Sequence, residues 1–260
     1  MNPGGTTYRR VEQVMGMPIS LALRGQHADD VRADAAWAAA LASLREADRV
    51  FSTYRTGSVI SRLDRGDLAL ADCPAEVAEV LAIAEQARVE SDGAFDVRRP
   101  GEDGTVRLDP SGVVKGWAVQ RAAAALAVLE DTDFCLSAGG DMVCRSQSPT
   151  SPGWRIGIED PHEPGRIVAV VPVRNGAVAT SGTAHRGDHI EDPRTGKAPA
   201  ALASVTVIGD DLTWVDIEAT AAFVLGDGAA TWLAGRAGRT GLIVYADGRT
   251  ELVGSAEDVC

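Results

Sequence analysis

The amino-acid sequence predicts an α+β fold, with largely antiparallel sheets and packed helices in two tightly joined lobes. Strand-like and helix-like segments are mixed along the chain without the regular repeat of a parallel sheet. Neither the GxGxxG nor the P-loop signature of dinucleotide and nucleotide sites occurs in the 260 residues. No stretch has the composition of a linker, so residues 11–260 are expected to form one domain after a tail of residues 1–10.

The first half of the chain predicts one strand followed by three helices. Residues 11–23 alternate loosely about a central glycine and predict a strand that bends. Apolar residues near helical spacing predict a helix over residues 29–50, and a second helix is expected from Pro74, which suits a first turn, to about Val89. The turn residues 109–112 lead into a third helix rich in Ala and Leu.

The second half predicts several short strands and two further helices. Apolar runs bounded by Gly, Pro and Asp are typical of strands. These runs cover residues 134–136, 154–158, 167–173, 177–180, 204–208 and 241–245. Helices are expected between them, at about residues 215–225 and 229–237.

Charge and composition limit the classes of function. The hydrophobic fraction of 45% is that of a globular protein, so the chain is expected to fold. The net charge of −12 opposes binding to a nucleic-acid backbone, so no nucleic-acid partner is expected. An acidic protein that handles a pyrophosphate would need a metal ion or helix N-termini to hold it.

The sequence also predicts where the protein works. No apolar run has the length of a membrane helix, and the N-terminal residues lack the pattern of a signal peptide, so a cytoplasmic protein without a membrane segment is expected. Cys73, Cys135, Cys144 and Cys260 show no CxxC pairing and are expected to be thiols.

Polar, Gly-rich clusters at the predicted ends of strands and helices indicate a site assembled from many loops. Each cluster taken alone has a structural explanation, such as a helix cap or a tight turn. In chain order they are Met15-Gly16, Phe51-Ser52 with Tyr54, Gly93-Ala94-Phe95-Asp96-Val97, Leu108-Asp109, Val114-Lys115-Gly116-Trp117, Gly139-Gly140-Asp141, Thr180-Ser181-Gly182, His189-Ile190 with Asp192-Pro193 and Thr195-Gly196, and Asp216 with Ala219-Thr220.

In this order and spacing the clusters resemble the ApbE family of flavin transferases (FAD:protein FMN transferases), over about residues 11–245. The resemblance implies an ApbE-like fold for residues 11–260. It also implies a transferase that cleaves the pyrophosphate of FAD, releases AMP and attaches FMN to a Thr or Ser hydroxyl of an acceptor flavoprotein. This protein flavinylation requires a cation to neutralise the diphosphate and a base for the hydroxyl.

The resemblance places a Mg²⁺ ion on Asp216, Thr220 and the backbone carbonyls of Gly112 and Ala219. Asp216 and Thr220 are four residues apart and would share one helix face. Carboxylate, hydroxyl and carbonyl oxygens are hard ligands suited to Mg²⁺. Without the resemblance, the same pair would indicate an ordinary helix start.

The resemblance assigns FAD binding to a second set of residues. They are Met15, Tyr54, Ala94, Phe95, Asp96, Asp109, Lys115 and Ile190. Tyr54 and Phe95 would offer flat faces for ring contacts, and the two Asp side chains would accept hydrogen bonds. Lys115, in the first turn of its predicted helix, would approach phosphate oxygens.

His189 is the expected catalytic base. An imidazole with an unperturbed pKa near 6.5 can accept a proton from an incoming hydroxyl at neutral pH. His185 lies in the same loop and competes for this role, whereas His27 and His162 are expected to be structural.

The chain departs from the family pattern at Met17, at Val215 and at Ser137-Ala138. Met17 and Ala138 could change how the flavin or its phosphates are held. Two other functions stay open: Mg²⁺-dependent hydrolysis of FAD to FMN and AMP, with water as nucleophile, and non-catalytic FAD binding.

Overall fold

The computed structural model describes residues 6–100, 104–147, 150–183 and 190–254. Helices and antiparallel sheets are mixed in it, which confirms the predicted α+β class. The elements are β1 Tyr8–Val14, β2 Met17–Gly25, α1 Val31–Phe51, α2 Val59–Asp64, η1 Leu70–Asp72, α3 Ala75–Glu90, β3 Arg98–Pro100, β4 Val106–Leu108, α4 Ser111–Leu126, β5 Thr132–Ala138, β6 Asp141–Arg145, β7 Trp154–Glu159, β8 Ile167–Val173, β9 Gly176–Gly182, β10 Leu202–Gly209, α5 Leu212–Leu225, η2 Gly226–Gly228, α6 Ala229–Ala234, β11 Thr240–Tyr245 and β12 Thr250–Val253.

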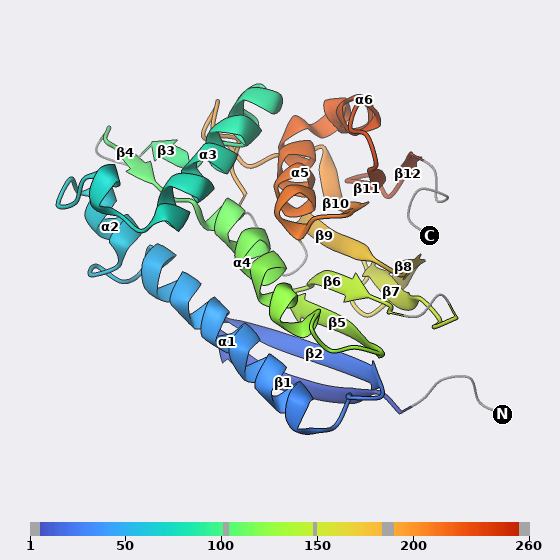
Figure 1. Cartoon of the computed structure of the whole chain (residues 1–260). Coiled ribbons are helices and arrows are strands. Elements are labelled where there is room, and N and C mark those ends of the chain that lie inside the picture. Colours follow the sequence, from blue (N-terminus) through green and yellow to red (C-terminus); the bar gives the residue numbers. More distant parts are fainter. Residues whose placement is uncertain (1–5, 101–103, 148–149, 184–189, 255–260) are drawn as a thin grey trace.

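An eight-stranded antiparallel sheet forms the body of the molecule. Its strands follow the order β1-β2-β5-β6-β9-β10-β11-β12. Helices α1, α4 and α5 lie on one side of this sheet, and α2, α3 and the small β3–β4 hairpin lie beyond the end of α4 (Figure 1). The helices that carry Lys115 and Asp216 are therefore neighbours across the middle of the sheet.

The N-terminal segment is a hairpin, so the prediction of a single bent strand over residues 11–23 is wrong. Strands β1 and β2 pair with Val14 opposite Met17, and β1 begins at Tyr8, within the expected tail. Met15 and Gly16 have φ values of 57° and 72°. Two successive left-handed residues form the turn that joins tightly paired antiparallel strands, and this turn reverses the chain where one strand was expected.

The two faces of the large sheet bury different apolar sets. Leu21, Leu23 and Leu136 point into the main core beneath the helices. The opposite face carries a smaller cluster that includes Cys135 and Cys144, which the β7–β8 hairpin covers. The period-2 alternation of a strand produces both faces from the same segments.

Cys135 and Cys144 face each other on paired strands as free thiols, 3.6 Å apart at sulfur. The prediction of thiols is thus confirmed for both and for Cys73, whereas Cys260 lies outside the described residues.

Helix starts follow the side chains that cap them. The carboxylate of Asp30 accepts hydrogen bonds from the backbone N–H groups of Arg32 and Ala33, and Asp211 caps α5 in the same way. The helices expected at residues 29–50 and from Pro74 to Val89 are confirmed as α1 and α3.

The sequence did not reveal the short elements α2, β3, β4, β6 and β12. Each spans three to six residues. Segments of that length are too short to show the apolar repeat of a helix or of a strand. The conformation of each is fixed by the strand or helix that it packs against.

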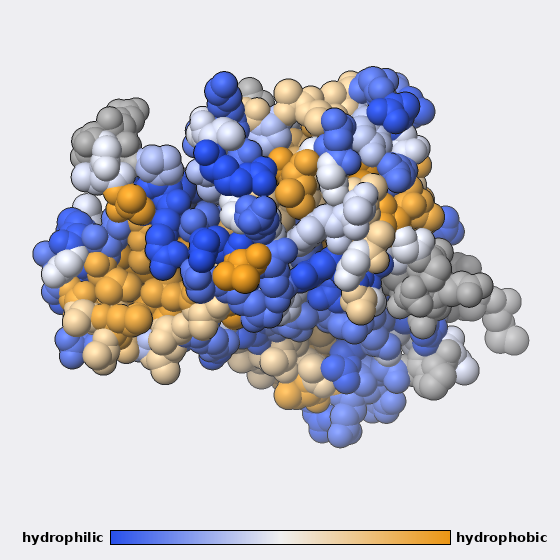
Figure 2. All heavy atoms as spheres, turned by 90° about the horizontal axis from the view of Figure 1, so that it is seen from above, coloured by the Kyte–Doolittle hydropathy of each residue, from blue (hydrophilic) through white to orange (hydrophobic). Residues whose placement is uncertain are grey.

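The surface is polar over most of the face seen from above, and apolar side chains gather toward the end where Figure 1 places α2, β3 and β4 (Figure 2). Leu70 and Val106 are among the large apolar side chains that stay exposed, at 45% and 66%. Among the described residues, no helix combines the length and apolar character needed to cross a membrane.

Candidate functional site

The site forms where α4 lies directly against α5. A Cβ atom at Gly116 would lie 2.6 Å from the carbonyl oxygen of Leu212 and 3.1 Å from the Cβ of Asp216. No larger side chain fits there without moving one helix, so Gly116 permits the close approach. This contact brings Lys115, the preceding residue, to the side chain of Asp216.

Lys115 joins two buried carboxylates from separate parts of the chain. Its Nζ atom lies 2.5 Å from Oδ2 of Asp141 and 3.0 Å from Oδ1 of Asp216. The side chains of Asp141 and Asp216 are 2% and 3% exposed, whereas that of Lys115 is 22% exposed. The structure thus brings the predicted Lys115 and Asp216 together and adds Asp141.

The Gly139-Gly140 pair places Asp141 in this cluster. Both glycines have positive φ, at 58° and 104°, and they form the turn between paired residues Ala138 and Asp141. The backbone N–H of Thr180, on the neighbouring strand β9, donates to Oδ1 of Asp141 over 3.1 Å. Asp141 is therefore held at the start of β6 with its other oxygen toward Lys115.

The electrostatics of the cluster are unbalanced, because a single ammonium faces two carboxylates. Burial raises the pKa of Asp216 to about 7; the positive charge of Lys115 opposes this rise, and the negative charge of Asp141 adds to it. Burial alone would lower the pKa of Lys115, but the charges of Asp216 and Asp141 outweigh it and raise that pKa. Oδ2 of Asp216 is buried without a hydrogen-bond partner among the described residues.

Thr220 lies one turn of α5 beyond Asp216 and hydrogen-bonds to Ser181. The two hydroxyl oxygens are 2.9 Å apart. Ser181 comes from β9, the strand that also supplies the N–H group to Asp141. The Thr180-Ser181-Gly182 cluster and the Asp216/Thr220 pair are thus neighbours in space, as a site built from several loops requires.

Oxygen donors of this kind fit a hard divalent cation. No group of three or more His, Cys, Asp or Glu side chains is arranged as a metal site in the described part of the chain. The expected ligand set contains one carboxylate, one hydroxyl and two backbone carbonyls, so it does not require such a group. The unpartnered Oδ2 of Asp216 is a buried anionic oxygen of the type that Mg²⁺ prefers.

Four residues predicted to bind FAD lie around the start of α4. Asp109 accepts a hydrogen bond from the N–H of Ser111 with Oδ1, and Asp96 accepts one from the N–H of Arg98. A Cβ atom at Gly112 would lie 3.2 Å from two ring carbons of Phe95. Phe95 is 4% exposed and Ala94 is 1% exposed, so little of the Phe95 ring is open for the predicted flavin contact.

The remaining predicted residues are more scattered. Tyr54 is 97% exposed in the turn after α1, Met15 lies in the β1–β2 turn, and Ile190 is buried in the main core. His189, the expected catalytic base, and its competitor His185 lie outside the described residues. The roles of all these residues stay predictions.

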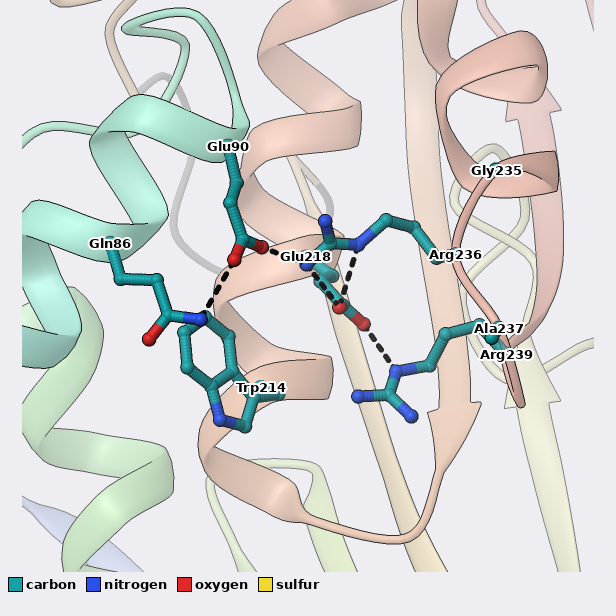
Figure 3. A pocket seen from close by; sticks show the side chains of 8 residues that line it. All are labelled: Gln86, Glu90, Trp214, Glu218, Gly235, Arg236, Ala237 and Arg239. Atoms are coloured by element: carbon teal, nitrogen blue, oxygen red, sulfur yellow. Dashed lines mark hydrogen bonds and ion pairs between the residues drawn. The ribbon is translucent and has the colours of Figure 1, made fainter.

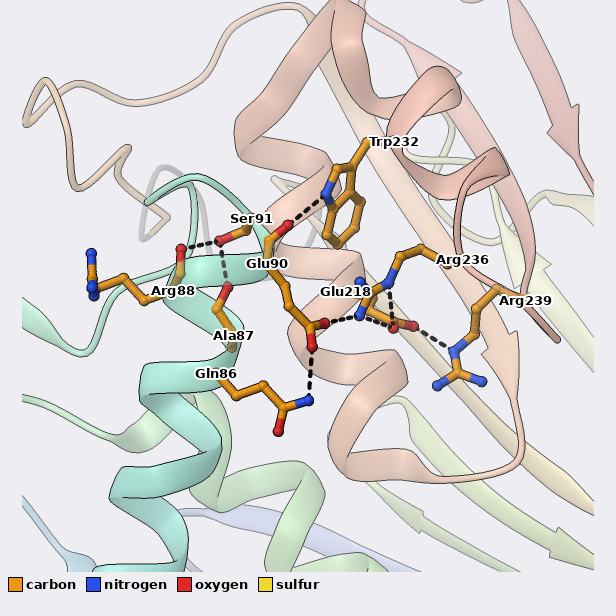
Figure 4. Close-up of polar contacts among 9 residues, drawn as sticks. All are labelled: Gln86, Ala87, Arg88, Glu90, Ser91, Glu218, Trp232, Arg236 and Arg239. Carbon is orange, nitrogen blue, oxygen red and sulfur yellow. Dashed lines mark hydrogen bonds and ion pairs between the residues drawn. The ribbon is translucent and has the colours of Figure 1, made fainter.

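The opposite face of α5 carries a second buried charged group. Glu218 is 1% exposed, and its carboxylate accepts hydrogen bonds from Nε of Arg236 at 3.1 Å and from Nε of Arg239 at 2.5 Å. Arg236 also pairs with Glu90, whose other oxygen accepts a hydrogen bond from Gln86 at 2.7 Å (Figure 4). Every carboxylate oxygen in this network therefore has a donor.

A cavity of about 310 Å³ opens beside this network, between α3, α5 and the connection from α6 to β11 (Figure 3). It is lined by Gln86, Glu90, Trp214, Glu218, Gly235, Arg236, Ala237 and Arg239. Because its charged groups already neutralise one another, it lacks the unpartnered buried group that distinguishes the Lys115 site.

Sequence reasoning missed Asp141 and Ser181 as members of the site, although both stand in clusters that it singled out. Asp141 directly follows two glycines and opens a strand that is otherwise largely apolar. A carboxylate at such a position would be buried unless it had a partner, and this signal could have identified it.

Fold and site together define an α+β protein whose single-ammonium, two-carboxylate cluster lies between two helices and an antiparallel sheet. The family model described as ApbE family matches residues 15–101 and 99–244. The chain therefore belongs to the ApbE family.

Relatives and solved structures agree with this assignment. The chain is 36% identical to the FAD:protein FMN transferase of Rhodobacter capsulatus over 131 residues, 47% of this chain and 25% of that protein. It is 30% identical to the protein of the same name from Haemophilus influenzae over 157 residues, 56% of this chain and 44% of that protein. These matches span less than half the length of either relative.

The fold is shared along nearly the whole chain. The ApbE protein of Thermotoga maritima superposes with a TM-score of 0.84 at 22% identity, covering 98% of this chain and 99% of that one. The apo form of the flavinyl transferase ApbE of Pseudomonas stutzeri gives 0.80 at 22% identity, covering 98% of both chains.

Proposed function

We propose that this protein is a Mg²⁺-dependent FAD:protein FMN transferase, which moves FMN from FAD to a Thr or Ser hydroxyl of an acceptor flavoprotein and releases AMP. The observation that carries the proposal is the buried cluster of Lys115, Asp141 and Asp216 between α4 and α5. Membership of the ApbE family and the names of the relatives supply the substrate class.

In the proposed reaction, the acceptor oxygen attacks the phosphorus of the FMN half. A phosphorus–oxygen bond forms to the acceptor, the bond to the AMP oxygen breaks, and AMP leaves with the bonding electron pair. His189 takes the hydroxyl proton. Lys115, in the first turns of α4, neutralises phosphate oxygens with its ammonium.

Mg²⁺ would be held by Asp216, Thr220 and the carbonyl oxygens of Gly112 and Ala219. When bound, it supplies positive charge that offsets the charge on the diphosphate. The unpartnered Oδ2 of Asp216 supports this assignment, as does the position of Thr220 one turn away on the same helix.

The test is incubation of the protein with FAD, Mg²⁺ and candidate acceptor flavoproteins, followed by intact-mass measurement of the acceptor. The expected result is an acceptor with one added FMN and an equal amount of AMP. AMP released without acceptor, at a rate that an acceptor does not change, would instead identify an FAD hydrolase. FAD that stays intact with Mg²⁺ and every acceptor present would identify a binding protein.

Replacement of His189 by Ala tests the proposed base. Positioned general bases contribute roughly 10²- to 10⁴-fold to a rate, so transfer should fall by a factor in that range. FAD affinity, followed by flavin fluorescence, should be retained. Full transfer activity in this variant would remove His189 from the mechanism, and the same assay on His185→Ala would then test the competitor.

The cytoplasmic location stays a prediction, which fractionation of cells that express the protein would test.

A further inference from the structure

Basic side chains are distributed unevenly over this chain. Arginine occupies 23 positions and lysine only two, Lys115 and Lys197. Arginines make the ion pairs with Glu218 and Glu90. A lysine stands at the one place where a cation bridges Asp141 and Asp216.

The two cations differ in what they can do at such a place. A guanidinium is a planar fork that suits a permanent, multidentate ion pair. An ammonium is a compact point charge on a flexible stem, closer in shape to a metal ion. The side chain of Lys115 is 22% exposed while those of its carboxylate partners are 2% and 3% exposed, so part of Lys115 is accessible to solvent and the carboxylates are not.

The charge count shows that the ammonium only partly neutralises the cluster. Two buried carboxylates face one positive charge among the described residues, and the ammonium contacts Oδ2 of Asp141 and Oδ1 of Asp216, which leaves Oδ2 of Asp216 without a donor. A buried anionic oxygen without a partner is costly. A divalent ion would balance the charge of the two carboxylates, which a monovalent ammonium does not.

We infer that Lys115 is an internal stand-in cation: in the ligand-free protein its ammonium holds Asp141 and Asp216, and a divalent metal ion must displace it. The inference rests on the proposed function for the metal site. Displacement would also release the ammonium toward the phosphates of an arriving dinucleotide. Lys115 would then act as a positioning residue whose charge weakens metal binding in the absence of substrate.

Titration calorimetry with Mg²⁺, without FAD and in weakly alkaline buffer, tests the inference. Coupling between competing sites typically changes affinity by about 5- to 150-fold, so Lys115→Met should bind Mg²⁺ at least about fivefold more tightly than the unmodified protein. Lys115→Arg keeps the competing charge and should not bind more tightly. Lys197→Met, at the only other lysine, is the matched control and should bind like the unmodified protein.

A second measurement uses the unmodified protein and does not depend on how the Lys115 variants fold. Lysine labelled with ¹³C at Cε should give two signals, one from each lysine. Addition of Mg²⁺ should shift the Lys115 signal and leave that of Lys197 in place, with the assignment taken from Lys197→Met.

Each outcome has a separate meaning. Equal or weaker Mg²⁺ binding by folded Lys115→Met, or a Lys115 signal that Mg²⁺ does not move, would overturn the inference. If Asp216→Asn loses Mg²⁺ binding in the same experiments, Asp216 remains a metal ligand even though the inference about Lys115 is overturned. Absence of Mg²⁺ binding in every variant would overturn both the inference and the metal site. Tighter Mg²⁺ binding by Lys115→Met, together with no FMN transfer by the unmodified protein, would sustain the inference and remove the proposed function.

Discussion

The two faces of α5 bury charge in opposite ways. On one face, Glu218 receives a hydrogen bond from each of two arginines, and Glu90 completes a network of two carboxylates and two guanidiniums (Figure 4). On the other, Asp216 and Asp141 share the ammonium of Lys115, and Oδ2 of Asp216 has no donor in the described structure.

This difference separates charge that stabilises the fold from charge available for binding. When every oxygen of a buried ion pair accepts a hydrogen bond, removal of either partner strongly destabilises the fold. A buried carboxylate oxygen that lacks a donor weakens the fold, and such sites persist where a ligand completes them. Asp216 and Glu218, two residues apart on α5, thus have different roles, because side chains two positions apart point to different sides of a helix.

The largest expected effect is on activity and comes from Asp216→Ala. Loss of the only carboxylate in the proposed ligand set should abolish Mg²⁺-dependent FMN transfer, a fall of roughly 10³-fold or more if the metal supplies several kcal/mol of charge stabilisation. Transfer rates measured over a Mg²⁺ titration check this. Wild-type turnover at excess Mg²⁺, with unchanged metal affinity, would show that Asp216 is not a ligand.

Glu218→Gln should have the next largest effect, which should be a loss of stability to unfolding. The substitution removes the buried charge that Arg236 and Arg239 share and leaves Arg236 paired with Glu90 alone, which should destabilise the protein by about 3 kcal/mol. Denaturant unfolding measures this loss. Mg²⁺ affinity of the folded variant should stay close to that of the unmodified protein, and a large loss of affinity would mean that the two faces are not independent.

Asp216→Asn should change stability in the opposite direction. Removing one of two carboxylates leaves Lys115 and Asp141 as a one-to-one pair, so the metal-free protein should gain about 1 kcal/mol, as relief of a strained functional site commonly does. Thermal unfolding without metal is the measurement. Asp227→Asn, the same charge change at an exposed residue, is the control and should stay within about 0.5 kcal/mol of the unmodified protein.

The gain in stability expected for Asp216→Asn should also depend on pH. The pKa of Asp216 is raised from 3.8 to about 7, so its contribution to stability is complete at low pH and is lost as pH rises through that interval. The advantage of Asp216→Asn should therefore be absent near the lower value and largest above the upper one. An advantage that did not vary with pH would have a cause other than ionisation of Asp216.

The sequence by itself determined the longer elements and the residue types of the site. Apolar spacing predicted helices α1, α3 and α5, and Pro74 marked the start of α3. The ordered clusters around Lys115, Asp216 and Thr220 carry the resemblance to the family. These features are local, because each depends on residues that are close together in the sequence.

Tertiary structure alone decided which of those clusters meet. The β1–β2 turn depends on left-handed φ angles at Met15 and Gly16, and sequence analysis took that segment for one strand. Asp141 entered the site because a Gly-Gly turn and the pairing of β6 with β9 carry it to Lys115, 26 residues away in the chain. Charge balance between such partners depends on distance and burial, which no single segment of sequence encodes.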